Sequence, residues 1–203
     1  MKGGDNDFQN PKVWVPPLLL TSLRIKTKMA RVGGWENAMD TSQKPKHDLA
    51  AVSGQFRVSG RFVAGETYGR GHINDTYAVT FEEGGTARRY ILQRVNHFVF
   101  KDPVSLMGNV QRVTEHQHRK LVEAGCPDPL RYALTLVQAL NGAVYHIDGE
   151  GNLWRMYVFI EDANSYDRIE KPAYAFEAAK AFGEFQKQLV DLPGPRLFET
   201  IPD

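Results

Sequence analysis

The sequence predicts an α+β fold in which an antiparallel sheet of about five strands packs with one long helix, and a further helix follows. Three observations predict this class. Segments rich in Val, Ile, Phe and Tyr recur with glycine-containing turns between them, a long helical pattern opens at Asp102-Pro103, and a second one opens at Pro172. The 203 residues allow one domain, or one domain and part of another.

The amino-terminal stretch, residues 1–47, shows neither a helical stripe nor strand alternation, so we expect a disordered or spurious extension there. Four basic and no acidic residues lie between Val13 and Trp35, a weak sign of a transit peptide. No Arg- and Ser-rich amphipathic helix can be drawn, however, and Met39 is a natural alternative start.

Order is expected from Asp48, with a short helix that Gly60 ends; the apolar residues on one face of this helix are Leu49, Val52 and Phe56. Three strands follow, the last two joined by the turn formers Gly84-Gly85 into a hairpin. These strands are expected over residues 61–67, 73–81 and 89–95.

Two helices and a second hairpin complete the expected order. Asp102 can cap free N–H groups and Pro103 suits a first helical position, and the apolar spacing then continues to Gly125. Strands over 143–147 and 153–160 flank a cluster of turn formers. The last helix opens at Pro172, and its apolar face, before the Pro-Gly-Pro break at 193–195, consists of Phe176, Ala179, Phe182 and Leu189.

Composition excludes several function classes. Lys and Arg number 25 against 24 Asp and Glu, a net charge of +1 that argues against nucleic-acid binding as the main task. The longest apolar run, residues 13–20, is short and interrupted by prolines, so no membrane partner is expected. The single cysteine, Cys126, excludes a disulfide framework and fits a reducing compartment, which favours the cytoplasm.

Residues 68–77, Tyr-Gly-Arg-Gly-His-Ile-Asn-Asp-Thr-Tyr, join two predicted strands. Their glycines can bring backbone N–H groups close to a phosphate, or they can form a tight turn without a ligand. The segment lacks the Gly-Lys-Ser/Thr of a P-loop, and a strand follows it where a dinucleotide-binding motif has a helix. A glycine loop between antiparallel strands, then a third strand and a long helix, is the layout of a kinase amino-terminal lobe.

The amino-acid sequence of this region resembles that of the aminoglycoside phosphotransferase-like kinases, most closely the N-acetylhexosamine 1-kinase group. The resemblance covers about residues 48–203 and is specific over 68–110. It rests on residues 68–77, Tyr-Ile-Leu-Gln-Arg-Val-Asn (90–96), Val-Phe-Lys-Asp-Pro (99–103) and Met-Gly-Asn-Val (107–110).

The resemblance implies a two-lobed kinase that transfers the γ-phosphate of ATP, with Mg²⁺, to a hydroxyl of a small substrate such as an amino sugar. Residues 48–162 would be the nucleotide-binding lobe, and 163–203 a linker and the start of an incomplete carboxy-terminal lobe. The implied ATP-binding residues are Gly69, Arg70, Gly71, His72, Asn74, Thr76, Gln93, Asn109, Phe159, Ile160, Glu161 and Asp162, the last four by backbone groups at the adenine edge.

One departure concerns the third strand, where kinases usually place a phosphate-binding lysine and this sequence has Gln93. An amide can still hydrogen-bond a phosphate oxygen, without the strength that a charge gives. Arg94 faces the other side of a regular strand and is either a surface charge or a ligand. Asn109 either pairs with Gln93 as an uncharged counterpart of the usual lysine–glutamate pair or satisfies backbone groups, while Glu115 is a solvated helix charge.

The resemblance also implies a catalytic Asp in a His-Gly-Asp loop and a later Mg²⁺-binding Asp, and neither motif occurs in these residues. We therefore assign no catalytic or metal-binding residue and expect the 203-residue chain, as part of a longer kinase, to be inactive alone. Alternatives are a non-catalytic kinase-like binding module, a pseudogene product, or a kinase for choline, hydroxylysine, methylthioribose or an aminoglycoside. The oligomeric state is not indicated.

Other chemistry-bearing residues are interpreted as structural. His146-Ile147-Asp148 imitates the start of a kinase catalytic loop, but the spacing to Asn152 is one residue short and the site is a hairpin turn. His116 and His118 cannot share a helical face, so they form no metal site. Cys126 has no base near it in sequence.

Overall fold

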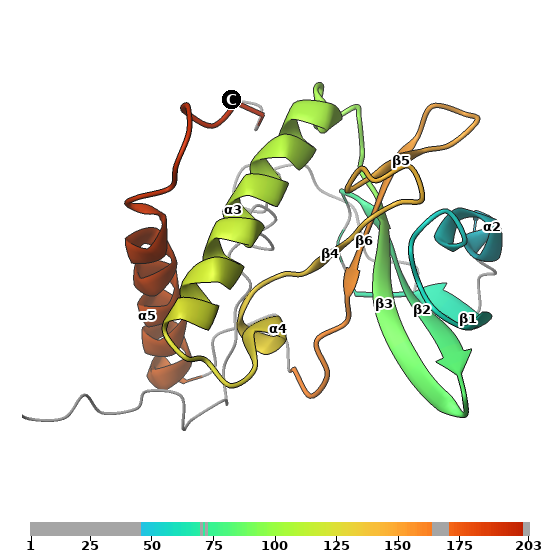
Figure 1. Ribbon diagram of the computed structural model, residues 1–203. Helices are drawn as coiled ribbons and strands as arrows, with labels where there is room; N and C mark the ends of the chain where they lie inside the picture. The colour runs from blue at the N-terminus through green and yellow to red at the C-terminus, as the bar shows by residue number, and fades with distance from the viewer. Residues whose placement is uncertain (1–45, 70, 72, 164–170, 201–203) are drawn as a thin grey trace, which may run out of the picture.

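The computed structural model describes residues 46–69, 71, 73–163 and 171–200 (Figure 1). The predicted extension over residues 1–47 lies outside them, apart from its last two residues. The described part is mixed α+β, with four helices and an antiparallel sheet of six strands. The predicted fold class is thus confirmed at this level, and the sheet has one strand more than expected.

Five of the six strands lie in the order β1-β2-β3-β6-β4, and the sixth, β5, pairs with β6 off this path. Their bounds are β1 Arg61–Thr67, β2 Asp75–Glu83, β3 Thr86–Arg94, β4 Leu136–Val137, β5 His146–Ile147 and β6 Leu153–Val158. Both predicted hairpins are therefore confirmed, although β2 starts two residues later than expected and β5 is shorter. Strand β4, with two residues, is too short to leave a periodic signal in the sequence.

The β2–β3 hairpin is tight because its two turn residues adopt positive φ angles, 57° at Gly84 and 79° at Gly85. Two consecutive left-handed residues match the twist of the flanking strands, and only glycine adopts them without strain. The register runs without a break from the Glu83–Thr86 pair to the Asp75–Arg94 pair. This turn fixes which residues of β2 and β3 lie side by side at the far end of the hairpin.

Helix α2 spans Leu49–Ser53 and ends at Gly54 rather than at Gly60. Phe56, expected on its apolar face, instead forms an isolated β-bridge with Ala139. The helical spacing was present in the sequence, but backbone pairing with the segment after β4 ends the helix early. The short helix α4, Pro129–Tyr132, was not expected.

The predicted long helix is confirmed as α3, Pro103–Glu123. Asp102 caps it by accepting a hydrogen bond from the Ser105 N–H at 2.9 Å, as the sequence predicted. Helix α5, Pro172–Leu189, is also confirmed, but none of its residues is buried in the described part, and Phe176 is 68% exposed. No helix in the described ranges is long and apolar enough to cross a membrane.

The sheet has two different faces, with α2 on one side and α3 on the other (Figure 1). The face towards α2 carries the largest apolar cluster, which consists of Leu49, Phe56, Tyr77, Val79, Phe81, Leu92, Ala139, Trp154 and Met156. The opposite face, called the α3 face here, presents the alternate residues of the same strands. It carries apolar groups such as Ala78 and Ile91, and Leu153 of β6 packs in one cluster with Met107 of α3.

The segment after α5 folds back along α3. The Asn109 side-chain amide donates to the Phe198 carbonyl at 2.8 Å and accepts from the Phe198 N–H at 3.0 Å. Arg112 donates to the carbonyls of Pro193 and Pro195. One turn further along α3, His116 hydrogen-bonds the carbonyl of Gln188, which lies in the last turn of α5, at 2.9 Å. These contacts join the predicted ranges 48–162 and 163–203, whose boundary stays a prediction.

Candidate functional site

The loop between β1 and β2 contains the two glycines expected to cover phosphates. Gly69 has a φ of 78°, whereas Gly71 does not lie in the left-handed region. A Cβ added at either position would have no atom within 4 Å, so the space beside both backbones is open. The Tyr68 N–H donates to the Thr76 carbonyl at 2.8 Å, which closes the base of the loop. Arg70 and His72 lie outside the described residues.

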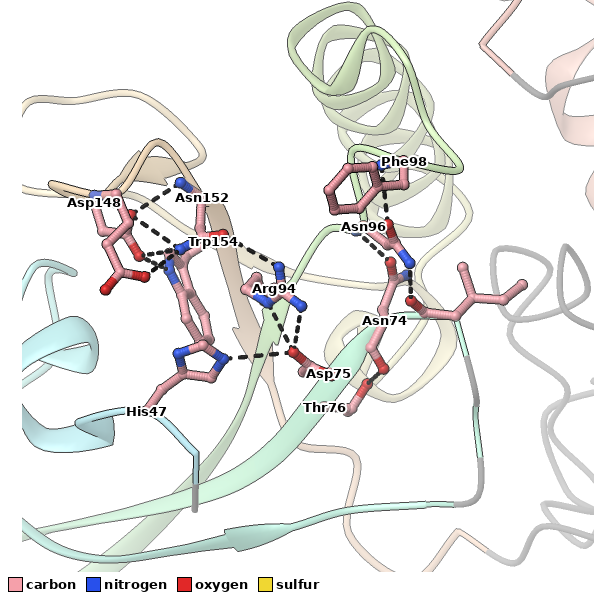
Figure 2. A network of polar contacts seen from close by, with 12 residues as sticks. His47, Asn74, Asp75, Thr76, Arg94, Asn96, Phe98, Asp148, Asn152 and Trp154 are labelled. Atoms are coloured by element: carbon pink, nitrogen blue, oxygen red, sulfur yellow. Dashed lines mark hydrogen bonds and ion pairs between the residues drawn. The ribbon is translucent and has the colours of Figure 1, made fainter.

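The end of this loop is fastened to the segment between β3 and α3 (Figure 2). The Asn74 side chain accepts from the Asn96 N–H at 2.9 Å, and the Asn96 amide donates to the Ile73 carbonyl at 2.9 Å. Asn74, expected to contact ATP, therefore uses its side-chain oxygen within the fold. These bonds fix the end of the loop, and contact of Asn74 with ATP stays a prediction.

Gln93 lies on the α3 face and is only 5% exposed. Its amide nitrogen donates to the Thr76 hydroxyl at 2.7 Å. Its amide oxygen accepts two hydrogen bonds from the Arg155 guanidinium, from Nε at 2.9 Å and from Nη2 at 2.6 Å. The three residues are consecutive register partners on β2, β3 and β6, so they form one row across the sheet.

The expected pair between Gln93 and Asn109 does not form. Gln93 is held by Thr76 and Arg155, and Asn109 holds the backbone of Phe198. The other interpretation of Asn109, that it satisfies backbone groups, is the one confirmed. Glu115 is exposed and accepts a hydrogen bond from Gln111, as expected of a solvated helix charge.

Arg155 is a residue that sequence reasoning missed. It lies directly opposite Gln93 on β6, and the only signal for it is non-local, since it requires knowing that β6 pairs with β3. In the described part of the chain its partners are the Gln93 oxygen and, at 4.0 Å from Nη1, the Met107 sulfur. Burial lowers the pKa of its guanidinium from the ordinary value.

The surface-charge interpretation of Arg94 is wrong, because its side chain is only 16% exposed. The alternative, a ligand role, stays a prediction. It faces away from Gln93, as expected, and forms an ion pair with Asp75 in which Nη2 and Oδ2 are 2.6 Å apart (Figure 2). Nη1 also donates to Asn152 at 3.2 Å. Burial acts to raise the pKa of Asp75, but hydrogen bonding and attraction from Arg94, and then from His47, hold it below the usual value. Arg94 thus joins the ends of two hairpins.

The expected adenine edge begins where β6 ends. The Phe159 ring lies 5.3 Å from that of Tyr68, centroid to centroid, and the Arg89 guanidinium stacks 3.9 Å from the Phe159 centroid. Arg89 also forms a two-point ion pair with Glu161, and its hydrogen bond lowers the pKa of that carboxyl. The segment from 159 to 161 is therefore held against β3 and the start of the glycine loop.

Not every backbone group of Phe159–Asp162 is open to an adenine. The Phe159 N–H donates to the Arg89 carbonyl at 3.2 Å, and Arg131 donates to the carbonyls of Glu161 and Asp162. Within the described residues, the N–H and carbonyl of Ile160 and the N–H of Glu161 carry no such bond. The Phe159 carbonyl and the Asp162 N–H are likewise without such a bond among the described residues, and the adenine contact itself stays a prediction.

The turn interpretation of His146-Ile147-Asp148 is confirmed. Asp148 accepts from the N–H groups of Glu150 and Asn152, both at 2.9 Å, and from the Trp154 indole at 2.7 Å. Burial acts to raise its pKa, but these bonds outweigh it and lower the pKa of Asp148 to about 2. The carboxylate is committed to the hairpin.

Two hollows lie elsewhere on the described part of the chain. One, of about 290 Å³, lies between α3 and the segment around β4, and another, of about 450 Å³, lies beside the start of α2. Neither includes the glycine loop or Gln93. No group of three or more His, Cys, Asp or Glu side chains in the described ranges is arranged to hold a metal ion. No protein-family model matches the chain.

Proposed function

We propose that the chain is the nucleotide-binding part of an ATP-dependent phosphotransferase that acts on a hydroxyl group of a small molecule. An amino sugar such as an N-acetylhexosamine is the substrate class that the resemblance implies. The observation that supports the proposal best is the placement of the glycine loop. It lies between β1 and β2, with open space beside both glycines, and its closing residue Thr76 is bonded to Gln93 on β3.

The arrangement suits both the phosphates and the adenine of ATP. Backbone N–H groups of a glycine loop bind phosphate oxygens at close approach because no Cβ intervenes. At the other end, Ile160 and Glu161 have backbone groups that make no backbone hydrogen bond within the described ranges and that suit the adenine edge. Bound ATP would supply the phosphoryl group, and the residues described here would bind and orient it.

The proposal includes no Mg²⁺ ligand among the described residues. Since no metal-binding cluster occurs in the described ranges, we assign no Mg²⁺ ligand to these residues. The substrate class, the catalytic base and a cytoplasmic location remain predictions from the sequence. Turnover is therefore not the measurement that tests the proposal; nucleotide binding is.

The test is isothermal titration calorimetry of the purified chain with ATP and Mg²⁺, on the wild type and on Gly71→Val. The wild type is expected to bind ATP. Gly71 lacks a positive φ and an added Cβ meets nothing within 4 Å, so valine is tolerated in the free chain. Its branched side chain would crowd a phosphate lying against the loop, so affinity is expected to fall roughly tenfold or more while the unfolding midpoint stays level.

The matched control is Gly149→Val, in the β5–β6 turn. Gly149 likewise has no positive φ and open space around it, but it lies on the other hairpin. It should change neither affinity nor midpoint. Failure of the wild type to bind ATP, or equal ATP affinity in Gly71→Val, would contradict the proposal and return the loop to ordinary turn chemistry.

A further inference from the structure

The α3 face of the sheet contains a positive charge that no carboxylate of the described residues neutralises. Buried and partly buried charges in proteins are normally paired, because removing them from water is costly. Two other arginines of strand β3 follow that rule: Arg94 pairs with Asp75, and Arg89 with Glu161. Arg155, partly buried, is bonded to an uncharged amide and lies near a thioether.

Among the described residues, the contacts of Arg155 hold the guanidinium in place but do not use all of its N–H donors. The Gln93 oxygen takes one bond from Nε and one from Nη2, which fixes the plane of the group. A guanidinium has five N–H donors, and the sulfur 4.0 Å from Nη1 is a weak acceptor. As far as the described residues show, donors therefore remain for a stronger acceptor, and the oxygens of phosphate suit the planar, charged guanidinium well.

The row Thr76–Gln93–Arg155 connects this cation to the loop. Thr76 is bonded to Gln93, and the Thr76 carbonyl accepts the Tyr68 N–H at the base of the loop. The Gln93 oxygen accepts from Arg155, and one of its amide N–H groups donates to Thr76. Gln93 is therefore a poor candidate for the main phosphate contact. The neighbours Ala78, Ile91 and Tyr157 are apolar or uncharged and lie on the same face.

We propose that Arg155, on the strand next to β3, supplies the positive charge that binds the nucleotide phosphates, with Gln93 acting as the residue that positions it. The inference rests on the proposed function, because it concerns the same nucleotide. It differs from the residue-by-residue expectation, which assigned the phosphate contact to Gln93 itself. Arg155 on β6 would thus supply the positive charge that kinases usually supply from a lysine on the third strand.

The experiment compares ATP with adenosine, which has the same base and sugar but no phosphate. Dissociation constants for both, ATP being titrated with Mg²⁺, are measured by NMR titration on the wild type, Arg155→Met, Arg155→Gln and Arg155→Lys. Arg155→Met is expected to weaken ATP binding about ten- to a hundredfold, the effect of losing a charge-assisted contact, with adenosine unchanged. Arg155→Lys, which keeps the charge, should retain most of the preference for ATP over adenosine.

Arg57→Met is the control, since it removes an exposed arginine that is bonded to Gln138 and the Leu140 carbonyl. If Arg155→Met does not fold, Arg155→Gln is the neutral variant that decides. Equal loss of ATP and adenosine would assign Arg155 to the fold alone, and an unchanged ATP constant would also overturn the inference while nucleotide binding stands. A wild type that binds neither ligand would instead refute the proposed function itself.

Discussion

The carboxylate of Asp148 offers a quantitative test of the structure, because its pKa links the β5–β6 hairpin to pH. Its pKa is lowered from 3.8 to about 2 in the folded chain. Such a shift corresponds to about 2.5 kcal/mol at most, and since the side chain is partly exposed we expect about 1–2 kcal/mol to survive solvent screening. The contribution favours folding because the charged form is the one that accepts the hydrogen bonds of the turn.

The sign of the pH dependence follows from the direction of the shift. A depressed folded pKa stabilises the protein fully above the unfolded value near 3.8, and the contribution is lost as pH falls from there towards 2. Roughly half should be gone by pH 3. Asp148→Asn removes the charge and places an amide N–H₂ among donors, so it should lower the free energy of unfolding by about 1–2 kcal/mol at pH 7.

The assay is urea unfolding followed by far-ultraviolet circular dichroism at pH 7, 5 and 3. The difference between wild type and Asp148→Asn should be equal at the two higher pH values and smaller at pH 3. Asp128→Asn is the matched control, because the Asp128 side chain makes no capping bond at the start of α4. A difference that does not change with pH, or an equal effect at Asp128, would refute the reasoning.

Two further predictions concern the ends of the chain. Asn109→Ala removes both side-chain bonds to Phe198, so local opening of the segment after α5 should rise roughly five- to thirtyfold, seen as faster limited proteolysis there without loss of helical circular dichroism; unchanged cleavage would show that these bonds do not hold it. Deletion of residues 1–38, which the sequence predicts to be dispensable, should leave Tm within about 2 °C, and a larger drop would show that they pack.

The features that could be predicted from the sequence are those with a local signal. The start of α3 follows from Asp102-Pro103, and the β2–β3 turn from Gly84-Gly85, because a cap or a left-handed pair is specified by the residues that form it. The turn at Asp148 could be recognised in the same way, from turn formers and a spacing that does not suit a catalytic loop.

The features that could not be predicted depend on partners far away in the chain. Arg155 meets Gln93 only because β6 pairs with β3, across 62 positions of sequence. Phe56 leaves its expected helix because Ala139 offers a backbone partner. For Asn109, the sequence left Gln93 and backbone groups open as partners, because it does not indicate which segment packs beside that residue of α3. The structure places the backbone of Phe198 there.

The contacts along α3 have a mechanical consequence. Asn109, Arg112 and His116 are spaced by three and four residues, so they form a single stripe, and each holds a successive part of residues 188–198. Sliding α3 along its axis by one turn, about 5.4 Å, would break all three attachments together. The end of α5 and the segment after it therefore resist axial movement of α3 together, more strongly than any one of these hydrogen bonds could alone.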